Sequence, residues 1–191
     1  MKRRSLLTTS GAFETPFDML AGCHQRIRTF SELAKRLPVQ PAPAEEVAEA
    51  ASRLHLYFGT ALPLHEEDEE QTLEQAMRQA GAPDMDAVFA RLRKEHRAIE
   101  EVLHDLLPRW ELLKVSPDRL AAERSALARG GEALASAFAP HLDMEENELY
   151  PLARRVLSAE VLAGMLRAMR ARREPLIGKL TSLHGTIVPG P

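Results

Sequence analysis

The chain carries one pattern of residues twice, and this repeat limits the folds that it can adopt. Residues 17–27 read FDMLAGCHQRI and residues 89–99 read FARLRKEHRAI, so a phenylalanine, a leucine, a histidine and an isoleucine recur at the same spacing. Residues 65–75 (HEEDEEQTLEQ) and 141–151 (HLDMEENELYP) form a second pair, in which a histidine precedes two glutamates by four and five residues. The offset is 72 residues in the first pair and 76 in the second. A repeated two-helix unit buries its apolar face against its copy, so the sequence predicts two helix pairs facing each other.

Apolar residues recur at helical spacing through almost the whole chain, interrupted by segments rich in proline and glycine. These breaks read LPVQPAP (37–43), QAGAPD (79–84) and KVSPD (114–118), and Ser158 is placed to cap a further helix. The expected helices cover 16–37, 44–79, 85–113, 117–156 and 158 to about 180. Short loops predict an all-α fold, an antiparallel four-helix bundle with an additional C-terminal helix. The expected division is an N-terminal extension (1–14), the bundle (15–156), the C-terminal helix (157–184) and a flexible tail (185–191).

Composition excludes several classes of protein. A single cysteine cannot form an internal disulfide or a zinc site with several cysteines. The net charge of −3 argues against generic nucleic-acid binding, and no apolar run approaches the roughly 20 residues of a membrane helix. The opening MKRRSLL resembles a twin-arginine export signal, but Glu14 and Asp18 fall where that signal requires an apolar stretch. We therefore expect a cytoplasmic protein that binds neither nucleic acid nor membrane.

Histidines and carboxylates have a spacing that suits a metal site. Two residues four apart on a helix lie one turn apart and about 40° around, so their side chains converge. Three of the seven histidines have an acidic residue at that spacing, where chance predicts roughly one. These pairs are His65 with Glu69, His96 with Glu100, and His141 with Glu145. A lone histidine on an apolar face is usually a core residue. Four histidines at matched positions, one on each expected helix (His24, His65, His96 and His141), instead favour ligation of metal.

This set of residues resembles the hemerythrin-like (HHE cation-binding) family. The likeness covers roughly residues 15–156 and includes the stretches YFGTALPLHEEDEE (57–70) and HLDMEENELYPLA (141–153). It implies a four-helix bundle with a non-haem di-iron centre. The ligands that it implies are His24 and His65 on one iron, His96 and His141 on the other, and Glu69 and Glu145 bridging both with an oxo or hydroxo group. Imidazole and carboxylate ligands also suit iron by their own chemistry, and manganese or zinc stays open.

The resemblance implies a protein that binds or senses dioxygen, nitric oxide or peroxide. One alternative is a di-iron enzyme that reduces nitric oxide or peroxide or repairs iron–sulfur clusters, so enzymatic activity is left open. A second alternative is a metal-free helical interaction module. The basic residues of 151–191 are compatible with docking on the acidic remainder of the chain or on a second copy, as in a homodimer.

Two glutamates and three aromatic residues are further candidates. Oxygen carriers of the family have a second histidine one turn after the first on the third helix, where this chain has Glu100. Glu100, and likewise Glu66 beside His65, is either a further ligand, a hydrogen-bond partner or a solvated residue. Tyr57, Phe58 and Phe138 precede the histidines by one or two turns and either line a small apolar pocket or pack in the core.

Overall fold

The structure is a computed structural model that describes residues 13–82 and 85–184, with side chains through residue 175. The expected tail (185–191) and almost all of the expected N-terminal extension (1–14) lie outside the described residues. Four long helical segments and a fifth helix account for nearly all of the rest, and the described residues include no strand. The expected all-α fold is therefore confirmed.

Each long segment begins and ends close to the expected residue. The first is α1 (Pro16–Arg36) and the third is α5 (Met85–Val115). The second runs without a break through α2 (Ala44–Leu56), η1 (Tyr57–Ala61), α3 (Leu62–Glu67), η2 (Asp68–Leu73) and α4 (Glu74–Gln79). The fourth comprises η3 (Pro117–Arg119), α6 (Leu120–Met144), η4 (Glu145–Leu149) and α7 (Tyr150–Val156). The fifth is α8 (Ala159–His184). The η3 segment is a 3₁₀ turn, whereas η1, η2 and η4 are π-helical turns that the α-helical pattern did not predict.

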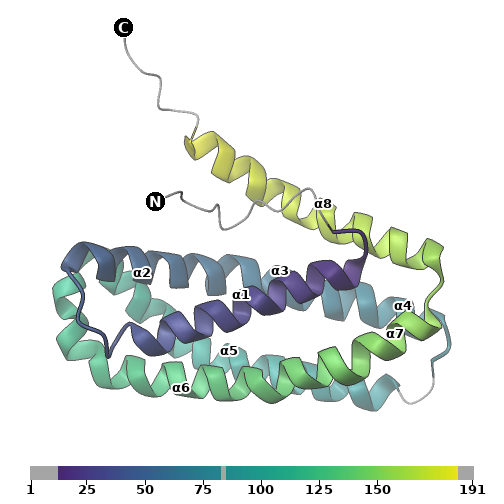
Figure 1. Ribbon diagram of the computed structural model, residues 1–191, viewed down its shortest axis with the longest axis horizontal. Coiled ribbons are helices and arrows are strands. Elements are labelled where there is room, and N and C mark those ends of the chain that lie inside the picture. Colours follow the sequence, from purple (N-terminus) through teal and green to yellow (C-terminus); the bar gives the residue numbers. More distant parts are fainter. Residues whose placement is uncertain (1–12, 83–84, 185–191) are drawn as a thin grey trace, which may run out of the picture.

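The four long segments alternate in direction and form an antiparallel bundle (Figure 1). Contacts join α1 to α6, α6 to α5, α5 to α2 and α2 to α1, so each segment touches two neighbours. The α8 helix packs outside this ring, against α1 and η2, and crosses the bundle obliquely in Figure 1. The bundle with an additional C-terminal helix thus matches the expectation.

Local chemistry fixes the helix ends. Thr15 caps α1: its hydroxyl accepts a hydrogen bond from the backbone N–H of Asp18 at 3.2 Å, while Asp18 accepts one from the backbone N–H of Thr15 at 2.9 Å. After α4, Gly81 adopts a φ of 67°, a conformation that suits glycine at a helix end. The Ser158 hydroxyl accepts from the backbone N–H of Val161 at 3.3 Å, as expected for the cap of α8.

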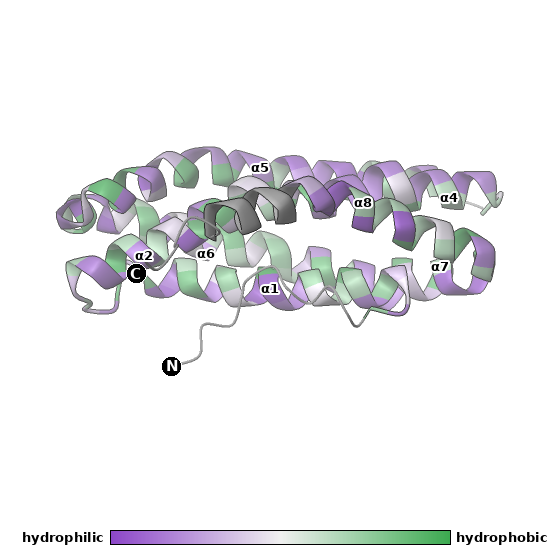
Figure 2. Ribbon diagram, turned by 90° about the horizontal axis from the view of Figure 1, so that it is seen from above, coloured by the Kyte–Doolittle hydropathy of each residue, from purple (hydrophilic) through white to green (hydrophobic). Residues whose placement is uncertain are grey.

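The interior consists of two apolar clusters with a polar layer between them. One cluster surrounds Trp110 and Phe58, and the other surrounds Phe17 and Phe89. Seen from above, apolar and polar residues are interspersed along the helices of the bundle, as amphipathic packing requires (Figure 2). The sequence-predicted histidines and glutamates fall in the layer between the clusters: on α1, for example, His24 lies between Leu20 of one cluster and Ile27 of the other.

No helix among residues 13–82 and 85–184 is long and apolar enough to cross a membrane.

Candidate metal centre

The bundle brings all six sequence-predicted site residues together in the polar layer. They form two overlapping groups, one of His24, His65, Glu69 and Glu145 and the other of His96, His141, Glu69 and Glu145. Within each group the candidate ligand atoms all lie within 4.8 Å of one another. The six residues are at most 3% exposed. Each long segment of the bundle contributes one histidine, and the two glutamates belong to both groups.

The distances between imidazole nitrogens and carboxylate oxygens are close to those of atoms arranged around a shared ion. Nε2 of His24 and Nε2 of His141 each lie 3.2 Å from a different oxygen of Glu145. Nε2 of His65 and Nε2 of His96 lie 3.6 and 3.4 Å from Oε2 of Glu69. Two atoms bound to one ion at about 2.1 Å are separated by about 3.0 Å at a right angle and about 3.4 Å at a tetrahedral angle. The two oxygens of Glu145 therefore face different groups, as a bridging carboxylate would.

Three of the four histidines are oriented by a carboxylate behind the ring. Nδ1 of His24 donates to Glu146 at 2.8 Å, Nδ1 of His96 donates to Glu70 at 2.7 Å, and Nδ1 of His141 lies 3.1 Å from Glu95. A carboxylate accepts, so in the neutral ring the proton stays on Nδ1 and the lone pair of Nε2 points into the site. This is the arrangement found behind metal-ligating histidines.

His65 breaks this pattern. Its Nδ1 is buried without a hydrogen-bond partner among the described residues, because the repeat places Cys23 where His141 has Glu95. Its Nε2 likewise has no hydrogen-bond partner there, and the same holds for Nε2 of His96, Oε2 of Glu69 and both oxygens of Glu145. Buried polar atoms are seldom left without a partner, and here they converge on one place. The donor atoms thus fit a cation.

Two π-helical turns begin at or beside the shared carboxylates. In η2 the backbone N–H of Glu74 donates to the carbonyl of Glu69, and in η4 that of Tyr150 donates to the carbonyl of Glu145. These bonds span five residues instead of four, and such turns occur frequently at functional sites. Both turns occupy repeat-equivalent positions, so the duplication extends to this backbone irregularity.

Burial favours the neutral form of three of the histidines. It lowers the pKa of His65 to about 3 and also lowers the pKa of His24 and His141. His96 differs: burial opposes its protonation, but contacts with Glu69 and Glu70 raise its pKa to about 9.

The two shared carboxylates shift in opposite directions. Burial opposes ionisation of Glu69, yet the neighbouring His65 and His96 lower its pKa. Burial and the charge of Glu69 raise the pKa of Glu145 well above its ordinary value. Two buried carboxylates this close cannot both ionise without additional positive charge, and a bound cation supplies such charge.

Several residues at the site were not singled out from the sequence. Glu70 and Glu146 are the second glutamates of the two HxxxEE stretches, so a signal for them was present. Arg28 holds Glu146 with hydrogen bonds of 2.9 and 2.8 Å. Glu95 carried no signal of this kind. Nor did Tyr150, whose hydroxyl contacts both Glu69 and, at 3.0 Å, Nε2 of His24.

The two additional glutamates lie outside both groups. Glu100 is exposed. Glu66 is half-buried, and its Oε1 is buried without a hydrogen-bond partner among the described residues. Burial raises the pKa of Glu66 to about 7; the charges of Glu100, Glu69 and Glu70 add to this effect and that of His96 opposes it.

A cluster of aromatic side chains packs against one of the site histidines, His141. The rings of Phe138 and His141 lie 6.3 Å apart, and Phe58 stacks on Phe138 at 6.2 Å. Tyr57 stacks on Phe30 at 4.1 Å. Tyr57, Phe58 and Phe138 are all buried in the apolar cluster around Trp110, so the core-packing alternative describes them.

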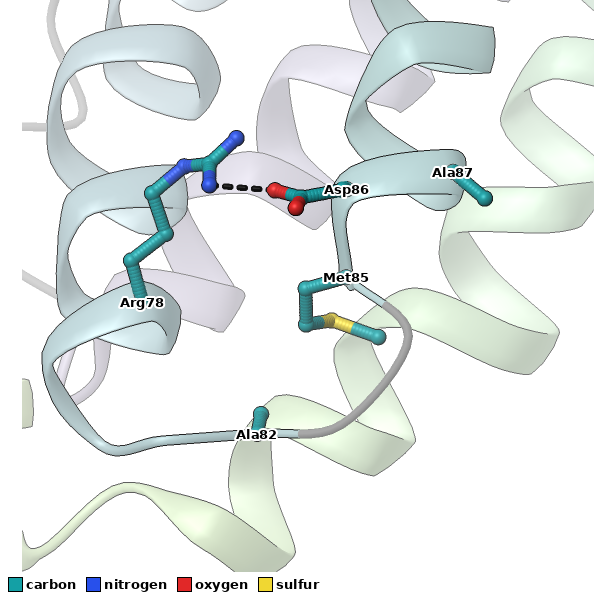
Figure 3. A pocket seen from close by; sticks show the side chains of 5 residues that line it. All are labelled: Arg78, Ala82, Met85, Asp86 and Ala87. Carbon is teal, nitrogen blue, oxygen red and sulfur yellow. Dashed lines mark hydrogen bonds and ion pairs between the residues drawn. The ribbon is translucent and has the colours of Figure 1, made fainter.

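A pocket of about 420 Å³ lies elsewhere, at the connection between α4 and α5 (Figure 3). Its lining includes Arg78, Met85 and Asp86, and Arg78 is ion-paired with Asp86. The lining contains none of the six site residues.

Comparisons with known proteins agree with the geometry. The family model of the hemerythrin HHE cation binding domain matches residues 15–153. A protein of Haemophilus influenzae, described as an uncharacterized protein, is 29% identical over 164 residues, which cover 83% of this chain and 90% of that relative. No solved structure matches the chain significantly.

Proposed function

The chain belongs to the hemerythrin HHE cation binding domain family, and on that premise we propose that it is a non-haem di-iron protein that binds or senses dioxygen, nitric oxide or peroxide. His24 and His65 would hold one iron, His96 and His141 the other, and Glu69 and Glu145 would bridge both together with an oxo or hydroxo group. The observation that carries this proposal is the pair of overlapping donor groups that share both carboxylates.

The donor set favours iron over the alternatives. It combines four imidazoles with two carboxylates and contains no thiolate. Imidazole and carboxylate together suit iron, whereas structural zinc is usually held in closed sites rich in cysteine. Iron at these positions supplies reversible redox chemistry and coordination of small molecules.

The chain's own residues would control orientation and access. Glu146, Glu70 and Glu95 hold three imidazoles with Nε2 toward the site. Burial of all six residues favours a ligand as small as a diatomic molecule or peroxide over a larger substrate. Phe138 packs against His141, and Phe58 stacks on Phe138, so apolar rings border the site at this histidine.

Metal content tests the first part of the proposal. We expect two iron ions per chain in protein purified from iron-replete cells, measured by elemental analysis against protein concentration. Freshly prepared protein with one metal ion or none would overturn the di-iron proposal, and the absence of metal would favour an interaction module.

Exposure of the reduced protein to each small molecule tests the second part. Stoichiometric spectral changes with dioxygen, nitric oxide or peroxide would support a binding or sensing protein. Sustained consumption of nitric oxide or peroxide in the presence of a reductant would instead identify an enzyme. An unchanged spectrum with all three molecules would contradict both.

A further inference from the structure

Tyr150 places a phenol oxygen among the donor atoms of one of the two metal positions. Its side chain is buried, and its hydroxyl donates to Oε1 of Glu69 and lies 3.0 Å from Nε2 of His24. The ring stacks on His24 with centroids 5.4 Å apart, and it packs against Phe17 at 5.6 Å with the two rings tilted by 43°. Packing therefore holds the hydroxyl in this place.

The π-helical turn explains how Tyr150 reaches the site. In a regular α-helix, a residue five positions after Glu145 lies about 140° around the axis from it. In η4 the backbone N–H of Tyr150 bonds to the carbonyl of Glu145, five residues back, and this wider turn brings Tyr150 beneath Glu145 on the same face.

The other half of the bundle lacks this phenol. The residue that corresponds to Tyr150 in the first half of the repeat is Glu74, which follows the equivalent π-helical turn, η2. Two arginines bind the Glu74 carboxylate: Arg78 at 2.8 Å and Arg93 at shorter range. Among the residues that the structure describes, the phenol therefore lies beside the position of His24 and His65 and not at the equivalent place in the other half.

We propose that the Tyr150 phenol oxygen is the fifth protein donor to the metal held by His24, His65, Glu69 and Glu145. Its distance of 3.0 Å from Nε2 of His24 equals the separation of about 3.0 Å expected for two atoms at a right angle on one ion. Tyrosine oxygen is an established iron ligand in proteins. The bond joins the phenol oxygen to the ion and releases the phenolic proton to the medium, and no electron is transferred.

This fifth donor would make the two metal positions chemically different. The position with Tyr150 would have two nitrogens and three oxygens from protein, whereas the position of His96 and His141 would have two nitrogens and two oxygens. Exogenous small molecules are therefore directed to the position of His96 and His141. This inference rests on the proposed function, because it requires metal at both positions.

The chain offers a matched test because it contains two tyrosines. Phenolate bound to Fe(III) gives a charge-transfer absorption in the visible region, and resonance Raman excitation within that band reveals phenolate ring vibrations that an oxo bridge does not give. We expect these vibrations in the ferric wild type and in Tyr57→Phe, and their loss in Tyr150→Phe. Tyr57 is buried, and its hydroxyl donates to the backbone carbonyl of Cys23 at 3.3 Å.

Iron content and helical circular dichroism would be measured on the same samples. Two irons per chain without phenolate vibrations, or vibrations that persist in Tyr150→Phe, would overturn the assignment and leave the di-iron proposal intact. Absence of iron from the wild type would instead overturn the di-iron proposal. If Tyr150→Phe does not fold, the wild type and Tyr57→Phe still decide the matter, since phenolate vibrations retained without Tyr57 can come only from Tyr150.

Discussion

Nδ1 of His24 lies 2.8 Å from Oε1 of Glu146, and the repeat reproduces this contact between His96 and Glu70 at 2.7 Å. Each carboxylate fixes the proton on Nδ1 and makes the opposite nitrogen a better donor. We expect Glu146→Ala and Glu70→Ala each to weaken metal binding at one position by roughly 10–100-fold, measured by competition with a chelator.

The exposed Glu148, on the same π-helical turn as Glu146, provides the control. Glu148→Ala should leave the affinity unchanged. If the Glu146→Ala and Glu70→Ala variants retained metal as tightly as Glu148→Ala, the contacts behind the rings would have no part in metal binding.

A second prediction concerns the shared carboxylates. Because Glu69 belongs to both donor groups, Glu69→Ala should deplete both metal positions, whereas His24→Ala should deplete mainly one. Elemental analysis of both variants, with the exposed Glu100→Gln as the control that keeps both metals, measures this difference. One metal fully retained in Glu69→Ala would show that the carboxylate binds at a single position.

A third prediction concerns the docking of α8. The carboxylate of Asp68 is fully buried and ion-paired with both Arg172 and Arg173 of α8, and Arg172 also lies 3.1 Å from the half-buried Glu67. Removal of one partner from a buried ion pair leaves charge without compensation. We expect Asp68→Ala to lower the free energy of unfolding by about 3 kcal/mol in urea denaturation.

The neighbouring Glu67 separates this effect from surface electrostatics. The Glu67 side chain is 44% exposed, so solvent can replace its ion pair and Glu67→Ala should cost less than about 1 kcal/mol. Equal losses from the two variants would mean that the buried pair does not anchor α8.

The sequence was sufficient to predict the helical segments and the fold. Proline and glycine mark the breaks at 37–43 and 79–84, and α1 and α4 end beside them. The three π-helical turns were not predicted, because each adds one residue to a helix at a place that uninterrupted α-helical spacing does not mark. The consequence appears at Tyr150, which α-helical spacing places on another face from Glu145.

Interactions between distant parts of the chain were also beyond the sequence. The HxxxEE spacing identified Glu69 and Glu145 as candidate ligands, because each lies four residues after its histidine on the same helical segment. Asp68 and Arg172 are 104 residues apart, and no local spacing connects them. The contact between Glu95 of α5 and His141 of α6 also joins two different helices, so local spacing could not predict it either. The assignment of all six site residues as ligands stays a prediction.

The close contact between α1 and α6 provides a last prediction. Gly131 is buried on α6, and a Cβ atom there would lie 3.0 Å from the carbonyl oxygen of Ala34 and 3.1 Å from the backbone nitrogen of Lys35. Backbone atoms cannot rotate away, so Gly131→Ala must separate the two helices. We expect a net loss of about 1–2 kcal/mol in the free energy of unfolding, because this strain exceeds the gain of about 1 kcal/mol in helix propensity.

Gly164→Ala on α8 is the matched control: its nearest contact is the Arg167 side chain at 3.7 Å, so it should be neutral or stabilising. A Gly131→Ala variant as stable as Gly164→Ala in thermal and urea denaturation would show that α1 and α6 tolerate a wider separation.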